Sequence, residues 1–226
     1  MPRTFAPDAV APGEALAMLR DGNRRFVRGE GTSLRRWHPG LVDGQWPFAI
    51  LLGCSDSRAP AEYVFDQGLG DLFVIRVAGP VVAPSIVGSI EFAASQFGTR
   101  LIVVMGHTLC GAVSATVRAL ERGGAPESRN LKSIVDRIAP GVQPLDVAKG
   151  PEARLSAAVQ ANAVACARAL RTSSPILADL LGRGRIAIVA SVFDLATGVV
   201  TFLDVPHVVE GRRQHAVSPR VIAKSR

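Results

Sequence analysis

Cysteine is scarce in this chain, with only three among 226 residues. An odd number of cysteines spread so thinly does not form the disulfide framework of a small secreted domain. No Cys-x-x-Cys pair occurs, which excludes a thioredoxin-like redox site. We therefore expect the thiols to stay reduced and to bind a metal or take part in chemistry.

Long apolar runs are also missing. The longest, over residues 48–53, 101–106 and 186–193, fall far short of the roughly 20 residues that a membrane-spanning helix needs. The first ten residues lack the basic start and apolar stretch of a secretory signal. We therefore expect a cytoplasmic protein with no membrane partner.

Acidic residues are absent from positions 211–226, where five basic residues supply most of the formal net charge of +7. The rest of the chain is nearly neutral, and no aromatic-rich nucleic-acid-binding motif accompanies the basic residues. We predict a single domain over residues 1–210 and a basic tail over residues 211–226 that we expect to be flexible. Nucleic acid is not an expected partner.

Short apolar runs alternate with helical patterns along the chain. The runs, typical of strands buried on both faces, are residues 48–53, 72–77, 101–105 and 186–192. Helical spacing covers residues 85–96, 111–122 and 152–171. This alternation predicts an α/β fold with a mostly parallel sheet of about four strands and helices on both faces.

Three further features complete the predicted fold. Residues 199–203 are expected to return as an antiparallel edge strand, and residues 12–30 to form an amphipathic helical arm at the N-terminal side. Residues 123–127 and 140–151, rich in Gly and Pro, are expected to be loops. The pattern Gly182-Arg-Gly184 precedes a strand, so we interpret it as a helix-ending turn rather than a dinucleotide-binding loop.

Polar clusters follow two of the predicted strands. Cys54, Asp56 and Arg58 begin where the first strand ends, and His107 and Cys110 follow the strand over residues 101–105. Because the carboxyl ends of parallel strands frame the ligand crevice of an open sheet, the two clusters can converge. Two thiolates and one imidazole are a typical zinc set, and three protein ligands leave the fourth position open, as catalytic zinc requires.

The third cysteine does not extend this set. Cys166 lies on a helical stripe with Val159, Asn162 and Leu170, where a small buried hydrophobic residue is expected. Cys110, by contrast, is expected at the first turn of the next helix, where the helix dipole favours a thiolate. His38, His207 and His215 have no such setting and are expected at the surface.

Four motifs, in the same order, resemble the signatures of the β-class carbonic anhydrases. They are residues 54–58, 65–71, 88–92 and 106–113. The resemblance covers about residues 13–202 and implies one zinc ion per subunit held by Cys54, His107 and Cys110, with Asp56 and Arg58 as a catalytic pair beside it. It also implies a zinc lyase that hydrates CO2 reversibly to bicarbonate and a proton, by attack of zinc-bound hydroxide.

The same resemblance implies a shared substrate pocket. Its residues are Gln45, Phe73, Ala78, Phe92 and Gly111. Gln45 would offer an amide to bicarbonate, and the two phenylalanines would form apolar walls. The family forms homodimers, often paired into homotetramers, with active sites at the subunit interface.

Asp56 lies two residues from Cys54 and can reach either Arg58 or the metal. A carboxylate with an ordinary pKa of about 3.9 stays ionised when the pH falls and can displace a weakly held water. We therefore expect Asp56 to become a fourth zinc ligand at low pH. Two alternatives remain at this point: carbon disulfide hydrolysis at the same site, or a non-enzymatic zinc-binding scaffold whose basic tail recruits a partner.

Overall fold

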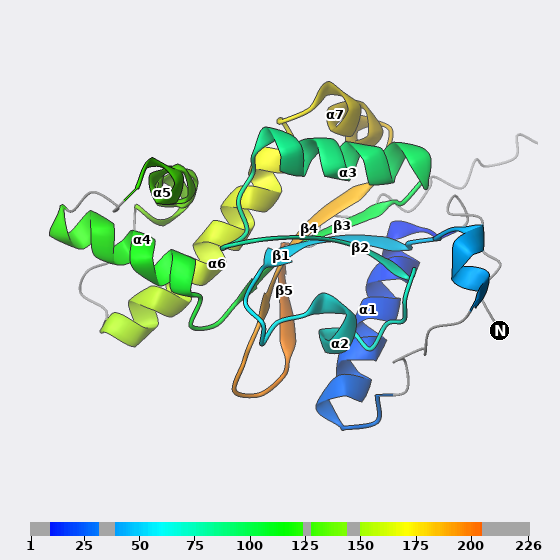
Figure 1. Ribbon diagram of the computed structural model, residues 1–226, viewed down its shortest axis with the longest axis horizontal. Helices are drawn as coiled ribbons and strands as arrows, with labels where there is room; N and C mark the ends of the chain where they lie inside the picture. Colours follow the sequence, from blue (N-terminus) through cyan, green and yellow to red (C-terminus); the bar gives the residue numbers. More distant parts are fainter. Residues whose placement is uncertain (1–9, 32–38, 124–127, 144–149, 205–226) are drawn as a thin grey trace, which may run out of the picture.

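The computed structural model describes residues 10–31, 39–123, 128–143 and 150–204, in which a five-stranded sheet lies between layers of helices (Figure 1). The strands are β1 (Ala49–Cys54), β2 (Leu72–Val77), β3 (Leu101–His107), β4 (Ala187–Phe193) and β5 (Val200–Asp204), in the order β2-β1-β3-β4-β5. Strands β1 to β4 pair in parallel and β5 pairs antiparallel to β4. The predicted α/β fold with an antiparallel edge strand is confirmed.

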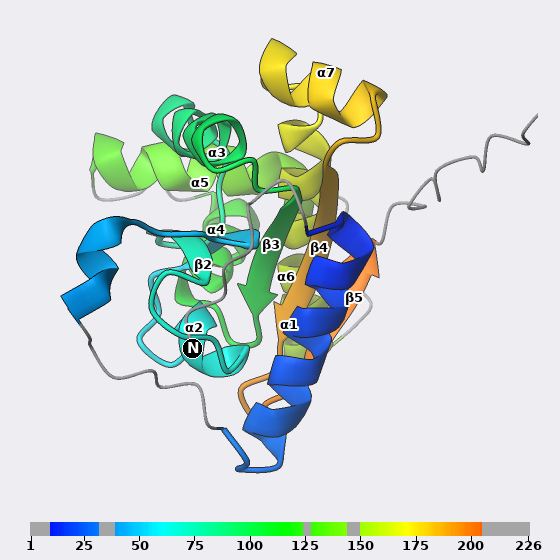
Figure 2. The same cartoon turned by 90° about the vertical axis from the view of Figure 1, so that its right-hand side faces the viewer.

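Apolar residues on both faces of each central strand explain the two helical layers (Figure 2). The face containing Leu51, Val103 and Val189 packs against α1 (Pro12–Val27) and α2 (Ala61–Val64). Neighbouring positions such as Ile102 point to the other face, because successive side chains alternate along a strand. The helices on that face are α3 (Pro84–Gln96), α6 (Pro151–Leu170) and α7 (Pro175–Gly182).

A third group of helices lies beyond the carboxyl ends of the strands. Helices α4 (Gly111–Arg122) and α5 (Arg129–Val142) pack against each other and against α6 (Figure 1). Their apolar side chains share a cluster with Cys54 and Cys110, so these two cysteines are buried at the end of the sheet that carries the polar motifs.

Helices α2, α5 and α7 are not among the helical stretches predicted from the sequence. The expectation of a loop from residue 140 is wrong, because α5 continues through Pro140 to Val142. Ile138 and Val142 are buried at this end of the helix, and their packing outweighs the backbone hydrogen bond that proline cannot donate. The expected turn at residues 182–184 is confirmed, since α7 ends at Gly182 and Gly184 has a φ of 64°.

The apolar face of the N-terminal helix packs against the core of its own chain. Leu16 and Leu19 of α1 are buried in the core. The buried Asn23 side chain donates to the Val64 carbonyl at 3.0 Å and accepts from the Val200 N–H at 2.9 Å. The apolar face of this arm is therefore no evidence for a second subunit. The predicted tail over residues 211–226 lies outside the described residues.

None of the helices described has both the length and the apolar character needed to cross a bilayer.

Candidate metal centre

The two polar motifs meet at the carboxyl end of the sheet. Cys54 is the last residue of β1, His107 is the last residue of β3, and Cys110 is the N-cap of α4. All three are buried, and their ligand atoms lie within 4.8 Å of one another. The two sulfur atoms are 4.0 Å apart. Tetrahedral zinc with Zn–S bonds of about 2.3 Å needs sulfur atoms about 3.8 Å apart, so this spacing fits the ion.

The imidazole of His107 is oriented as a ligand. Its Nδ1 lies 2.9 Å from the Thr108 carbonyl, which can only accept, so Nδ1 carries the proton. Nε2 is then left with its lone pair, and this buried atom has no hydrogen-bond partner among the described residues. Buried polar atoms normally have a partner, so an unpaired Nε2 beside two thiols is what a metal ligand requires.

The two thiols share one negative charge in the metal-free protein. The neighbouring Cys110 thiol, the His107 imidazole and the Gly79 N–H lower the pKa of Cys54 to about 4, although burial opposes this. The hydrogen bond to Cys54 and burial raise the pKa of Cys110 above its ordinary value. The helix terminus acts in the expected direction, since the N–H groups of Ala112 and Val113 at the start of α4 lower the pKa of Cys110, but the neighbouring Cys54 thiolate and burial outweigh them in the metal-free site.

Residues 107–110 form a tight turn that brings the histidine and the second thiol together. Leu109 has a φ of 58°, a left-handed conformation that costs energy in a non-glycine residue. The Thr108 N–H donates to the Phe193 carbonyl, and the Thr108 hydroxyl oxygen accepts from the Leu195 N–H, both at 2.9 Å. These bonds to the end of β4 hold the strained turn in place.

Asp56 and Arg58 form a two-pronged ion pair beside the cluster. Arg58 Nε donates to Asp56 Oδ1 at 2.9 Å, and Arg58 Nη2 donates to Oδ2 at 2.7 Å. Hydrogen bonds from the Arg58 side chain hold the pKa of Asp56 well below its usual range. Asp56 Oδ2 lies 3.9 Å from His107 Nε2, so an ionised carboxylate faces the ligand set.

Sequence reasoning missed two groups that hold Cys54. Arg76 donates from Nε to the Cys54 carbonyl at 2.9 Å and from Nη2 to the Asp56 carbonyl at 2.6 Å. The Gly79 N–H donates to Cys54 Sγ at 3.2 Å. The signal for Arg76 was available, since it is the one charged residue in the otherwise apolar run of residues 72–77. A backbone donor such as the Gly79 N–H cannot be recognised in this way from the sequence.

Only part of the expected substrate pocket lies near this cluster. Ala78 and Gly111 adjoin Gly79 and Cys110 in the chain, next to the sulfur atoms. Phe73 pairs with Ile50, four residues before Cys54 and thus about 13 Å away along the strand.

Phe92 and Gln45 lie toward that opposite end as well. The Phe92 ring packs 6.4 Å from the Phe73 ring and is 53% exposed. Gln45 is exposed and precedes β1. A single copy of the chain therefore does not bring Gln45, Phe73 and Phe92 to its own cluster.

Cys166 is a core residue, as predicted. It is 4% exposed and packs with the apolar side chains between α6 and the sheet. Burial raises the pKa of its thiol to about 12, which makes it unreactive. His38, His207 and His215 lie outside the described residues, so their expected surface positions stay predictions.

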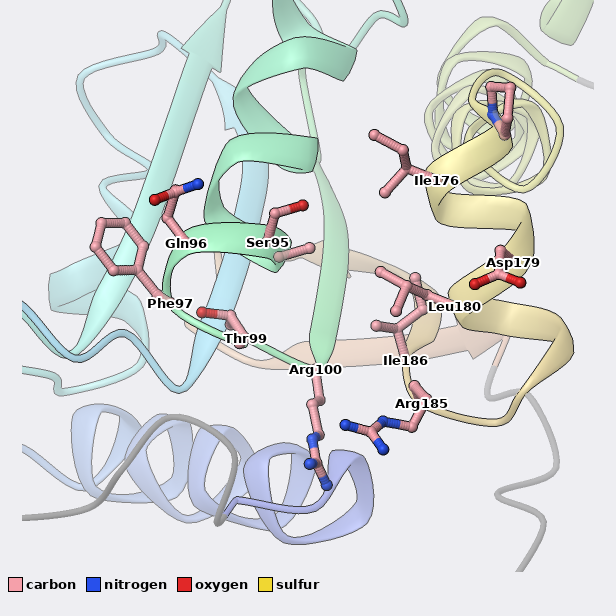
Figure 3. A pocket seen from close by; sticks show the side chains of 13 residues that line it. Ser95, Gln96, Phe97, Thr99, Arg100, Ile176, Asp179, Leu180, Arg185 and Ile186 are labelled. Atoms are coloured by element: carbon pink, nitrogen blue, oxygen red, sulfur yellow. The ribbon is translucent and has the colours of Figure 1, made fainter.

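A pocket of about 660 Å³ lies at the opposite end of the sheet, between α3, α7 and the start of β4 (Figure 3). Ile176 and Leu180 of α7 line one side, and Arg100 and Arg185 lie at one end. None of the predicted metal-ligating or catalytic residues lines it. The pocket is separated from the cysteines by the length of the strands and has no part in the chemistry of the cluster.

Comparison with known proteins places these features in a family. The sequence model described as carbonic anhydrase matches residues 49–200. Carbonic anhydrase 2 of Mycobacterium tuberculosis is 37% identical over 201 residues, which cover 85% of this chain and 93% of that protein. A carbonic anhydrase of Mycolicibacterium smegmatis is 39% identical over 193 residues, covering 84% and 92%. The solved structure of the β-carbonic anhydrase CcaA superposes with a TM-score of 0.66 at 25% identity, covering 84% of this chain and 87% of that one.

Proposed function

The chain belongs to the β-class carbonic anhydrases, and on this basis we propose that it hydrates CO2 reversibly with one zinc ion per subunit, held by Cys54, His107 and Cys110. The observation that carries the zinc assignment is the buried cluster of two thiols and an imidazole whose Nε2 has no partner among the described residues. Two sulfur ligands and one nitrogen ligand suit zinc, and three protein ligands suit a catalytic site.

Zinc bound there would act as a Lewis acid and lower the pKa of water at the site. The Cys54 and Cys110 thiolates would together neutralise its formal charge, so this effect should be weaker than in an all-histidine site. Activity should therefore be highest under alkaline conditions.

Asp56 is the proposed hydrogen-bond acceptor that orients the attacking water. Its Oδ2 lies 3.9 Å from His107 Nε2, beside the ligand set. Arg58 keeps this carboxylate ionised and fixes its orientation through two parallel hydrogen bonds. An ionised, oriented carboxylate accepts a hydrogen bond and cannot donate one, which sets the direction in which the water must point.

A homodimer or homotetramer would complete the pocket. Phe92 is about half exposed, and it packs with Phe73 at the edge of the sheet formed by β2. A second subunit could cover these two rings. The rings and Gln45 would then form walls of the active site of that second subunit. Ala78 and Gly111 would line the pocket from the same chain. A cytoplasmic location stays a prediction, supported by the reduced state of three free cysteines.

A stopped-flow assay of CO2 hydration on purified protein, with zinc content measured in parallel, tests this function. We expect about one zinc per chain and a kcat/KM on the order of 10⁴–10⁸ M⁻¹s⁻¹. Asp56→Asn should keep its zinc and lose about 100-fold or more in kcat/KM, because the amide can donate a hydrogen bond where the carboxylate only accepts, so the water is no longer held in one orientation. Zinc-loaded protein that hydrolyses carbon disulfide but does not hydrate CO2 would overturn the substrate assignment, and inactivity toward both would favour a scaffold.

A further inference from the structure

We propose that Asn162 is a positioning residue of the metal centre: it holds the Pro80 carbonyl and thereby aims the Gly79 N–H at the Cys54 sulfur. The proposal rests on the assignment of Cys54 as a metal ligand. It gives a role to a buried amide of α6 that lies outside both polar motifs.

The contacts form a continuous path from α6 to the ligand. Asn162 Nδ2 donates to the Pro80 carbonyl at 2.9 Å. Pro80 directly follows Gly79 in the chain. The Gly79 N–H donates to Cys54 Sγ at 3.2 Å. The Cys166 thiol also reaches the Pro80 carbonyl, at 3.2 Å. Thiols are weak donors, so the amide is the stronger of the two holds.

The segment from Ala78 to Pro80 needs such a hold. It follows β2 without regular secondary structure, and Gly79 has a φ of 71°. Pro80 has no N–H and cannot be tied down as a donor, so its carbonyl is the group that α6 can hold. Gly79 and Pro80 are both buried, where water cannot supply the missing bond.

Asn162 is an unfavourable residue for its position unless it makes these bonds. It is 1% exposed on a helix face whose buried neighbours are Val159, Ala163 and Cys166. Burying an amide in such surroundings costs stability when its donors and acceptor are unpaired. No apolar residue at this position could donate to the Pro80 carbonyl.

The chemical effect falls on the sulfur. A hydrogen bond to a thiolate withdraws electron density from it, and groups around a metal ligand tune its affinity and electronic properties in this way. In the metal-free protein the Gly79 N–H is one of the groups that lower the pKa of Cys54, after Cys110 and His107. If the Gly79 N–H no longer pointed at Cys54 Sγ, this sulfur would be more electron-rich and its position would be less fixed.

The test uses the full-length protein with Co²⁺ in place of zinc, because thiolate-to-cobalt charge-transfer absorption reports directly on the sulfur. Asn162→Leu keeps the approximate shape and removes the donor. Asn162→Ala is the second variant, since alanine is well tolerated within a helix. Cys166→Ala is the graded comparison: it lies one turn further along the same buried face and leaves the amide bond to Pro80 intact. It removes the weaker thiol bond to the Pro80 carbonyl and the 3.9 Å contact of the thiol with Asn162 Oδ1.

We expect both Asn162 variants to shift the charge-transfer band to lower energy, because an electron-rich sulfur is easier to oxidise. Their zinc affinity, measured by competition with a chelator, should fall about 10- to 100-fold. Cys166→Ala should change the band and the affinity much less than either Asn162 variant, because a thiol is the weaker donor. Circular dichroism and thermal melting establish that each variant is folded.

Two results would overturn the inference, and they are distinguishable from failure of the zinc assignment. If Asn162→Leu and Asn162→Ala keep the wild-type band and affinity, Asn162 does not position the Gly79 N–H. If Cys166→Ala changes the band and the affinity as much as the Asn162 variants do, the amide of Asn162 is not the group that positions the Gly79 N–H. If wild-type protein shows no thiolate-to-cobalt band at all, the metal assignment itself fails and the inference falls with it.

Discussion

Zinc binding to the metal-free protein should release between one and two protons at about pH 7.5. Cys54, with a pKa of about 4, is already a thiolate and releases none. The pKa of Cys110 is raised above its ordinary value of 9.0, so this thiol carries one proton that the metal must displace. Burial opposes a charge on His107, but the neighbouring Cys54 thiolate outweighs burial and raises the pKa of His107 above its ordinary value, so protonated imidazole contributes a further fraction.

The same protons set the pH dependence of zinc affinity. Each proton displaced makes the apparent affinity rise tenfold per pH unit, so we expect a rise of about 10- to 100-fold per unit near neutral pH. The rise should level off above the raised pKa of Cys110, where no proton remains to be displaced. Titration calorimetry in two buffers with different ionisation enthalpies counts the released protons directly.

A matched variant tests the origin of the effect. The largest cause of the low pKa of Cys54 is its hydrogen bond from Cys110, so Cys110→Ala should raise the pKa of Cys54 toward an ordinary thiol value. Ultraviolet thiolate absorbance of the metal-free variant follows this titration, with Cys166→Ala as the control that leaves it unchanged. Zinc binding without proton release, or an unchanged Cys54 titration in Cys110→Ala, would refute the shared-charge description.

Four further results are expected. Arg58→Ala should move the acid limb of the activity profile to higher pH, because Asp56, released from its ion pair with Arg58, can displace water from zinc more readily; an unchanged profile would contradict this role. Crystals of zinc-loaded protein at acidic and alkaline pH should show an Asp56 oxygen about 2 Å from zinc in the acidic form only. Phe92→Asp should yield an inactive monomer by light scattering, and an active monomer would exclude the shared pocket. Deleting residues 211–226 should leave turnover and zinc content unchanged, whereas lost turnover would place the tail at the site.

The parallel strands could be predicted because each central strand is buried on both faces. Runs such as residues 101–105 are continuous in apolar residues, and no polar alternation competes with that pattern. Helix α5 could not be predicted in the same way, because Pro140 disfavours helix locally. The burial of Ile138 and Val142 that overrides it arises from contacts with α4 and α6.

The candidate ligands could be found because polar residues directly follow two parallel strands, whose carboxyl ends meet at one edge. The groups that hold those ligands could not be found from the sequence. Asn162 donates to the carbonyl of Pro80, 82 positions earlier in the chain, and in the sequence it is one member of a helical stripe. Gly79 acts through its backbone N–H, which every residue except proline possesses. Such contacts depend on tertiary packing and leave no pattern in residue type.

X-ray absorption at the zinc edge, on protein purified without added metal, tests the assignment of Cys54, His107 and Cys110 most directly. We expect one zinc per chain with two sulfur neighbours at about 2.3 Å and nitrogen or oxygen neighbours at about 2.0–2.2 Å, including one imidazole. Cys110→Ala should reduce the sulfur count or remove the metal. A spectrum with no sulfur, with four sulfur neighbours, or unchanged in Cys110→Ala would contradict the proposed ligand set.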